Sequence, residues 1–239
     1  MIKLHPPYSI GKNQLMTLQR SGFDDYLYST ESGLIDFVIV ETELRNLNDY
    51  AVGILEYTHD ELRNHQQRFD KYRATDETEV PDLPEGGLGK NEVYTSDEMM
   101  FAMEDVLTWS KNLGFVTPAM ILVMLHILTE KSLKALCYSF SEGEGEYEIP
   151  ADTRFKVPVR SGESSIDANI RWLKDECHFE FDVESGMYDL LDKCREIRNN
   201  FAHGDWSVVQ KKLQEIELVD AFSAVSKLFS SIDKGMPEP

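Results

Sequence analysis

Six consecutive residues near the C-terminus, from Arg198 to His203, bring together an arginine, two amides and a histidine. An arginine presents a rigid fork of donors that suits a phosphate group on which negative charge is building up. A histidine with a pKa near neutral can accept a proton and return it. Asn199 and Asn200 can add a hydrogen bond to a phosphate or orient the histidine. We therefore take Arg198, Asn199 and His203 as candidate catalytic residues, with Asn200 in a supporting role.

A helix must position these side chains. Over residues 185–201 the apolar residues recur at steps of three and four, which is the pattern of an amphipathic helix. Gly204 is a natural place for that helix to end. At about 100° per residue, Arg198 and His203 would lie roughly 140° apart on an unbroken helix. The two side chains can share a site only if the helix ends near His203 or if a second copy of the chain completes the site.

The stretch Arg198-Asn199-Asn200-Phe201-Ala202-His203 resembles the signature of HEPN (higher eukaryotes and prokaryotes nucleotide-binding) domains, in which an arginine and a polar residue are followed, after three variable residues, by a histidine. Proteins of this family are helical bundles, and many are metal-independent endoribonucleases that act as homodimers. The resemblance implies a composite site in which two arginines and two histidines line one cleft. It also implies cleavage of RNA to a 2′,3′-cyclic phosphate, with no cofactor and no metal.

Glu130 is the candidate supporting residue outside the motif helix. It lies on a strongly apolar segment, four residues before Lys134, and this spacing favours a solvated ion pair between the two. The alternative is that Glu130 faces Arg198 and fixes the orientation of its side chain, since HEPN-like proteins often carry a polar residue on an adjacent helix. We interpret His126, on the same segment, as a core or boundary histidine.

Basic side chains near the motif are candidate contacts for an RNA backbone, namely Lys193, Arg195, Lys211 and Lys212. The chain carries a net charge of −19 at pH 7, so most of its surface should repel a polyanion. Acidic neighbours also leave the motif segment only mildly basic. These charges argue against extended RNA binding and are compatible with a brief encounter at one small site.

The periodicity predicts an all-α protein, because alternating Val- and Ile-rich runs are too few to build a sheet. Thr95 to Glu98 has the pattern of a capping box, Gly114 is expected to end the helix that this box opens, and Ser164 or Ser165 is expected to cap a later one. Residues 154–160 alternate in polarity, which allows a short strand or hairpin arm. Helices are expected over residues 32–72 (interrupted near 49–53), 97–113, 118–140, 166–177, 185–201, from 206, and 216–232.

The expected organisation is a HEPN-like helical bundle over residues 96–235, preceded over residues 1–95 by a leader, additional N-terminal helices and an acidic loop. The two parts could pack as one domain. Long acidic loops are expected over residues 74–95 and 141–163. Three widely spaced cysteines, the lack of a signal-peptide pattern and a longest apolar run of about half a membrane span predict a reduced, cytoplasmic protein without a membrane anchor.

Two functions from different classes fit these observations. The first is a homodimeric, metal-independent endoribonuclease of the toxin or phage-defence type, with RNA as substrate and an antitoxin or regulatory protein as a further partner. The second is a non-catalytic HEPN-like interaction or dimerisation module whose acidic face, including residues 77–85, binds a basic protein. The strongly negative net charge of the chain favours the second function. The intact spacing from Arg198 to His203, with the polar Asn199, favours the first, and we expect an enzyme.

Overall fold

The computed structural model describes residues 18, 20, 26–78, 90–141, 147–149 and 154–237, without the side chains of residues 74–78 and 90–96. Within this part of the chain the regular elements are helices, and none is a strand. The predicted all-α fold is therefore confirmed. Residues 154–160, where a short strand was possible, have an irregular backbone. Most of the predicted leader lies outside the described residues. The predicted loop over 74–95 is wrong at both ends, because residues 74–78 and 90–95 are helical, and residues 79–89 lie outside the described residues. In the predicted loop over 141–163, the described residues have a non-helical backbone, and residues 142–146 and 150–153 lie outside them.

The chain forms two compact units. Among the described residues, the first unit falls within Gly53–Pro118, and the second falls within Met16–Val52 and Ala119–Pro239. The long helix α2 (Ile35–Thr78) contributes its first part to the second unit and the rest to the first. The boundary between the units differs from the predicted boundary at residue 95. Every candidate site residue lies in the second unit.

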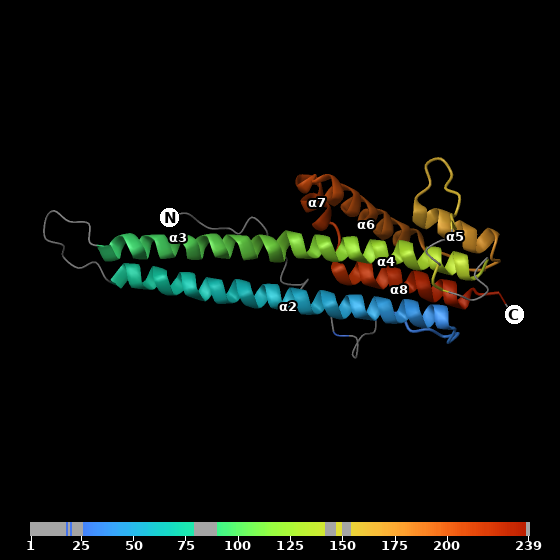
Figure 1. Cartoon of the computed structure of the whole chain (residues 1–239), viewed down its shortest axis with the longest axis horizontal. Coiled ribbons are helices and arrows are strands. Elements are labelled where there is room, and N and C mark those ends of the chain that lie inside the picture. Colours follow the sequence, from blue (N-terminus) through green and yellow to red (C-terminus); the bar gives the residue numbers. More distant parts are fainter. Residues whose placement is uncertain are drawn as a thin grey trace. The chain divides into compact units, whose positions relative to one another are not determined.

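The second unit is a helical bundle that includes α4 (Thr117–Ser139), close to the predicted range of 118–140. Figure 1 shows α4 next to the last helix, α8 (Leu218–Lys234), with α5, α6 and α7 along the same pair. Large side chains from α2, α4 and α8 are completely enclosed and form the core, including Phe37, Leu44, Leu122, Leu125, Leu133, Leu136, Phe222 and Phe229. Much of the apolar surface that predicted these helices is therefore buried between them.

Three shorter helices complete the second unit: α5 (Ser165–Asp175), α6 (Ser185–His203) and α7 (Trp206–Leu213). The side chain of Ser164 caps α5 in a reciprocal capping box with Asp167, which confirms the predicted helix start. Helix α6 packs against both α7 and α8. Buried residues Leu191, Cys194 and Ile197 fix the face of α6 that turns inward, so the opposite, polar face is available to a ligand.

The chain segment before α2 is fastened to the end of α8. The carboxylate of Asp233 accepts hydrogen bonds from the hydroxyl of Tyr28 at 2.8 Å, the hydroxyl of Thr30 at 3.0 Å and the backbone amide of Glu31 at 2.8 Å. Just beyond, the carbonyl of Gly235 accepts from the amide of Glu180 at 2.7 Å. These bonds fix the ends of the chain segments at the edge of the bundle. The candidate site lies in the same bundle.

The first unit pairs the second part of α2 with α3 (Lys90–Lys111). Helix α3 begins at Lys90, so the predicted capping box at Thr95–Glu98 is wrong, because those residues lie inside the helix. The predicted stop at Gly114 is also wrong. A π-helical turn, η1 (Asn112–Val116), keeps the backbone helical through the glycine and into α4.

The predicted interruption of the first helix at residues 49–53 is absent from α2, which runs through that region. Ala51, Val52 and Leu55 are buried there. The packing of these side chains outweighs the cost of about 1 kcal/mol for a glycine inside a helix.

One helical run in the described residues, Asp97–Ser139, has a window long and apolar enough to cross a membrane, with a mean hydropathy of 1.7. In that window 56% is buried inside the protein, and a core helix gives the same signal.

Candidate functional site

Helix α6 carries the Arg198–His203 stretch and ends where the sequence predicted. His203 is its last residue, and Gly204 follows with φ 77°, in the left-handed region that glycine adopts without strain. The amide of Gly204 donates back to the carbonyls of Asn200 and Phe201. His203 is therefore held at the exposed C-terminal end of the helix.

The guanidinium of Arg198 bends toward the neighbouring amide. Its Nη1 donates to the side-chain oxygen of Asn199 at 2.9 Å, and the Arg198 side chain remains exposed. Asn199 and His203 are four residues apart on a continuous helix, so they lie on the same face. The hydrogen bond thus draws Arg198 toward the face that carries His203. In the described part of the chain no hydrogen bond or ion pair joins Arg198 directly to His203.

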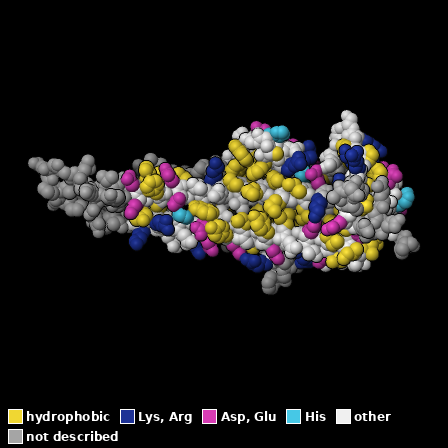
Figure 2. Space-filling view, viewed as in Figure 1, with side chains coloured by type: hydrophobic (Ala, Val, Ile, Leu, Met, Phe, Trp, Pro, Cys, Tyr) yellow, Lys and Arg dark blue, Asp and Glu magenta, His cyan; other side chains and the backbone are white. Residues whose placement is uncertain are grey.

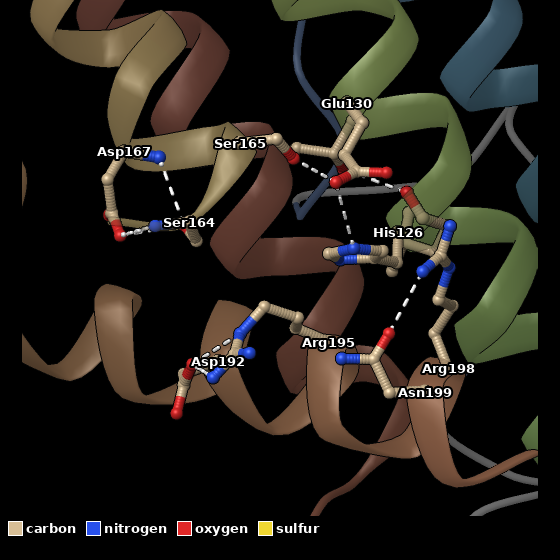
Figure 3. Close-up of polar contacts among 11 residues, drawn as sticks. His126, Glu130, Ser164, Ser165, Asp167, Asp192, Arg195, Arg198 and Asn199 are labelled. Carbon is tan, nitrogen blue, oxygen red and sulfur yellow. Dashed lines mark hydrogen bonds and ion pairs between the residues drawn. The ribbon is translucent and has the colours of Figure 1, made fainter. Parts of the chain in front are cut away.

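Glu130 lies opposite this arginine on α4 and is fixed by two partners (Figure 3). Its carboxylate accepts a short hydrogen bond from the hydroxyl of Ser165 and pairs with Nε2 of His126 at 3.4 Å. Hydrogen bonding to His126, followed by the Ser165 bond and the charges of His126 and Arg198, lowers the pKa of Glu130 to about 2 despite partial burial. Glu130 is thus negatively charged at neutral pH and lies near Arg198.

The partner of Glu130 corrects one interpretation drawn from the sequence. The ion pair with Lys134 does not form, and Lys134 is exposed. His126, which we interpreted as a core or boundary histidine, is buried as expected, with 2% of its surface exposed, but it also supports the site through Glu130. The signal was present in the sequence, because His126 and Glu130 stand four residues apart on one helix. Ser165 could not have been found, because its contact with Glu130 joins distant elements.

The predicted RNA-binding cations are mostly engaged with acidic or carbonyl partners. Arg195 donates Nε and Nη2 to one oxygen of Asp192, at 2.8 and 2.6 Å. Lys212 pairs with Glu196 at 2.7 Å, which raises the pKa of this lysine. Lys193 donates to the carbonyl of Glu215 at 3.4 Å, and Lys211 is exposed. The positive charge of the site therefore comes chiefly from Arg198.

Asn200 does not join the site. Its amide donates to the backbone carbonyl of Glu196 at 2.7 Å, one turn earlier in the same helix. The structure therefore brings Arg198, Asn199 and Glu130 together and holds His203 one turn away from Asn199. The Asn200 side chain is hydrogen-bonded within its own helix.

This arrangement combines a phosphate-binding arginine in a defined orientation with an exposed histidine that can exchange protons with solvent or a ligand. Among the described residues no three His, Cys, Asp or Glu side chains converge closely enough to hold a metal ion. No family model, curated protein or solved structure matches the chain. The residues and geometry of the site are thus the basis for a functional assignment.

Proposed function

We propose that the protein is a metal-independent endoribonuclease that cleaves RNA at a composite site formed by two copies of the chain. One observation carries the proposal: Arg198 is hydrogen-bonded to Asn199, on the helix face of His203, with the anionic Glu130 beside it. A guanidinium held in this way meets a phosphate with little loss of conformational freedom. The resemblance to HEPN domains adds the expectation of RNA as substrate.

The proposed reaction is an internal transfer at phosphorus. His203 removes the proton from a ribose 2′ hydroxyl, and the 2′ oxygen attacks the phosphorus. Arg198 binds the non-bridging oxygens as their charge increases. The bond to the 5′ oxygen breaks, and the partner subunit's His203 donates a proton to that leaving oxygen. The products are a 2′,3′-cyclic phosphate and a free 5′ hydroxyl.

An exposed apolar surface near the site supports the proposal that a second copy of the chain binds there. Met120, Met124 and Ile127 follow each other at steps of four and three along α4, and their surfaces are 44%, 38% and 50% exposed. Trp206 and Val208, just after the motif, are 50% and 40% exposed. Figure 2 shows hydrophobic side chains gathered on the face where α4, α6 and α7 lie. Apolar side chains grouped in this way are typical of an interface between proteins.

The charge of the chain limits the kind of ribonuclease that we propose. A net charge of −19 disfavours tight binding along an RNA strand, so the enzyme should touch its substrate only near the scissile phosphate. We propose a toxin or phage-defence role in the cytoplasm, restrained by an antitoxin or other regulatory protein. The expected cellular mark is growth arrest on expression that disappears in His203→Ala and Arg198→Ala.

The biochemical test is incubation of the purified protein with mixed RNA in EDTA, followed by analysis of the 3′ ends. We expect 2′,3′-cyclic phosphates from the wild-type protein and none from His203→Ala or Arg198→Ala. A matched control is His178→Asn, which changes another exposed histidine of the same unit; its φ is 59°, and asparagine tolerates this conformation. Intact RNA with the wild-type protein would contradict the proposal and favour the interaction-module alternative.

A further inference from the structure

A cavity of about 240 Å³ lies between the start of α5 and the polar face of α6. Ser164 and Asp167 line it from α5, and Tyr188, Asp192 and Arg195 line it from α6. Pockets for drug-sized ligands measure about 300–1,000 Å³. This smaller cavity therefore suits a single ring system held by several polar groups.

The walls of the cavity are held in place by their own hydrogen bonds. The Asp167 carboxylate accepts from the hydroxyl of Ser164 at 2.7 Å in the capping box of α5. Burial, followed by the nearby charge of Asp167, raises the pKa of Tyr188, so the half-buried Tyr188 phenol that lines the same cavity stays uncharged. Among the described residues, the Asp192–Arg195 pair uses only one oxygen of Asp192. The second oxygen and Nη1 of Arg195 remain for a ligand.

The α6 residues that line the cavity share one face of the helix with Asn199 of the proposed cleavage site. Tyr188, Asp192, Arg195 and Asn199 follow each other at steps of four, three and four, so they form one stripe on the helix. Asn199, at the end of the stripe, holds the guanidinium of Arg198. Figure 3 shows Asp192 and Arg195 on the α6 ribbon that also carries Asn199 and Arg198. A phosphate bound by Arg198 thus places an adjacent base within reach of the cavity, about one helical turn away.

We propose that this cavity is a nucleobase subsite of the ribonuclease and that it selects guanine, an inference that rests on the proposed RNA cleavage. The Watson–Crick edge of guanine presents a carbonyl oxygen next to two N–H donors. The free oxygen of Asp192 accepts from the adjacent N1–H and 2-amino donors, Nη1 of Arg195 donates to O6, and the Tyr188 ring packs on the base. Adenine, cytosine and uracil each lack this pair of adjacent donors.

Binding of single nucleotides tests the subsite independently of catalysis. The full-length His203→Ala variant is titrated with GMP, AMP, CMP and UMP by calorimetry, and we expect GMP to bind about tenfold more tightly or better. Adding Asp192→Asn or Arg195→Gln should remove this preference. The matched control Asp182→Asn, an exposed carboxylate outside the cavity, should keep it. Equal affinities, preference for another base, no binding, or an unchanged preference in Asp192→Asn would overturn the guanine subsite.

Sequencing of cleaved RNA ends separates this inference from the proposed activity. Cuts concentrated beside guanines, with the bias lost in Asp192→Asn, support both. Cuts spread evenly over all four bases overturn the subsite and leave the ribonuclease proposal standing. Selective GMP binding by a protein that cleaves no RNA sustains the guanine subsite and overturns the ribonuclease proposal.

Discussion

Replacement of Glu130 by glutamine should destabilise the second unit and disorder Arg198. Glutamine keeps the size of the side chain and can still accept from Ser165, but it removes the charge opposite His126, whose side chain is 1% exposed. The pKa of Glu130 is about 2, against an ordinary value of 4.5, and one pKa unit corresponds to about 1.4 kcal/mol. The charged carboxylate therefore contributes at most about 3.5 kcal/mol. Its side chain is 28% exposed, so we expect a smaller loss of about 1–3 kcal/mol at pH 7.

The stabilisation that Glu130 contributes should depend on pH. Because the pKa of Glu130 is lower in the folded protein than in the unfolded chain, its stabilisation is complete above about pH 4.5 and is lost as the pH falls toward 2. Urea unfolding followed by circular dichroism from pH 7 to pH 2.5 measures it, with the exposed Glu180→Gln as control. We expect Glu130→Gln to unfold at lower urea at pH 7, to lose less stability in acid than the wild type, and to cleave RNA about tenfold to a hundredfold more slowly. A variant with wild-type stability at pH 7 and an unchanged acid dependence would refute the reasoning.

Three further substitutions test the scaffold of the site. Gly235→Ala would place its Cβ against the backbone carbonyl of Glu180. We therefore expect the free energy of unfolding in urea to fall by about 1–3 kcal/mol. The control Gly53→Ala, with open space around the glycine, should leave the stability unchanged or raise it slightly. Asp233→Ala leaves the buried Tyr28 hydroxyl without its acceptor and should cost about 1–3 kcal/mol, with the exposed Asp220→Ala as control. Wild-type melting of Asp233→Ala would show that the carboxylate is dispensable. Ser164→Ala removes the cap of α5 and should cost about 1 kcal/mol, against no measurable change for Ser185→Ala.

Local signals in the sequence predicted the elements that carry the site. The end of α6 depends on one glycine in a left-handed conformation and the start of α5 on one capping box, and both are properties of a few neighbouring residues. The capping pattern at Thr95–Glu98 failed because it is equally compatible with a helix interior. The stop at Gly114 failed because a π-helical turn accommodates the glycine and lets the helix continue.

The contacts of the site were predictable only where they follow helical spacing. Asn199 and His203 share a face because they are four residues apart, and the same spacing pairs His126 with Glu130. From the sequence we considered only Lys134 at this distance, whereas in the structure the buried His126, four residues before Glu130, is the partner. The bond from Ser165 to Glu130 and the cavity between α5 and α6 depend on tertiary packing, which no local pattern encodes.

The composite nature of the site is tested most directly by a dimer that contains one wild-type chain and one His203→Ala chain, purified through two different tags. If the two copies share one site, loss of either histidine leaves one proton transfer without its group. The account therefore predicts that the mixed dimer cleaves RNA almost as poorly as the His203→Ala homodimer. A mixed dimer that retains about half of the wild-type activity would show that each chain carries a complete site and would contradict the account.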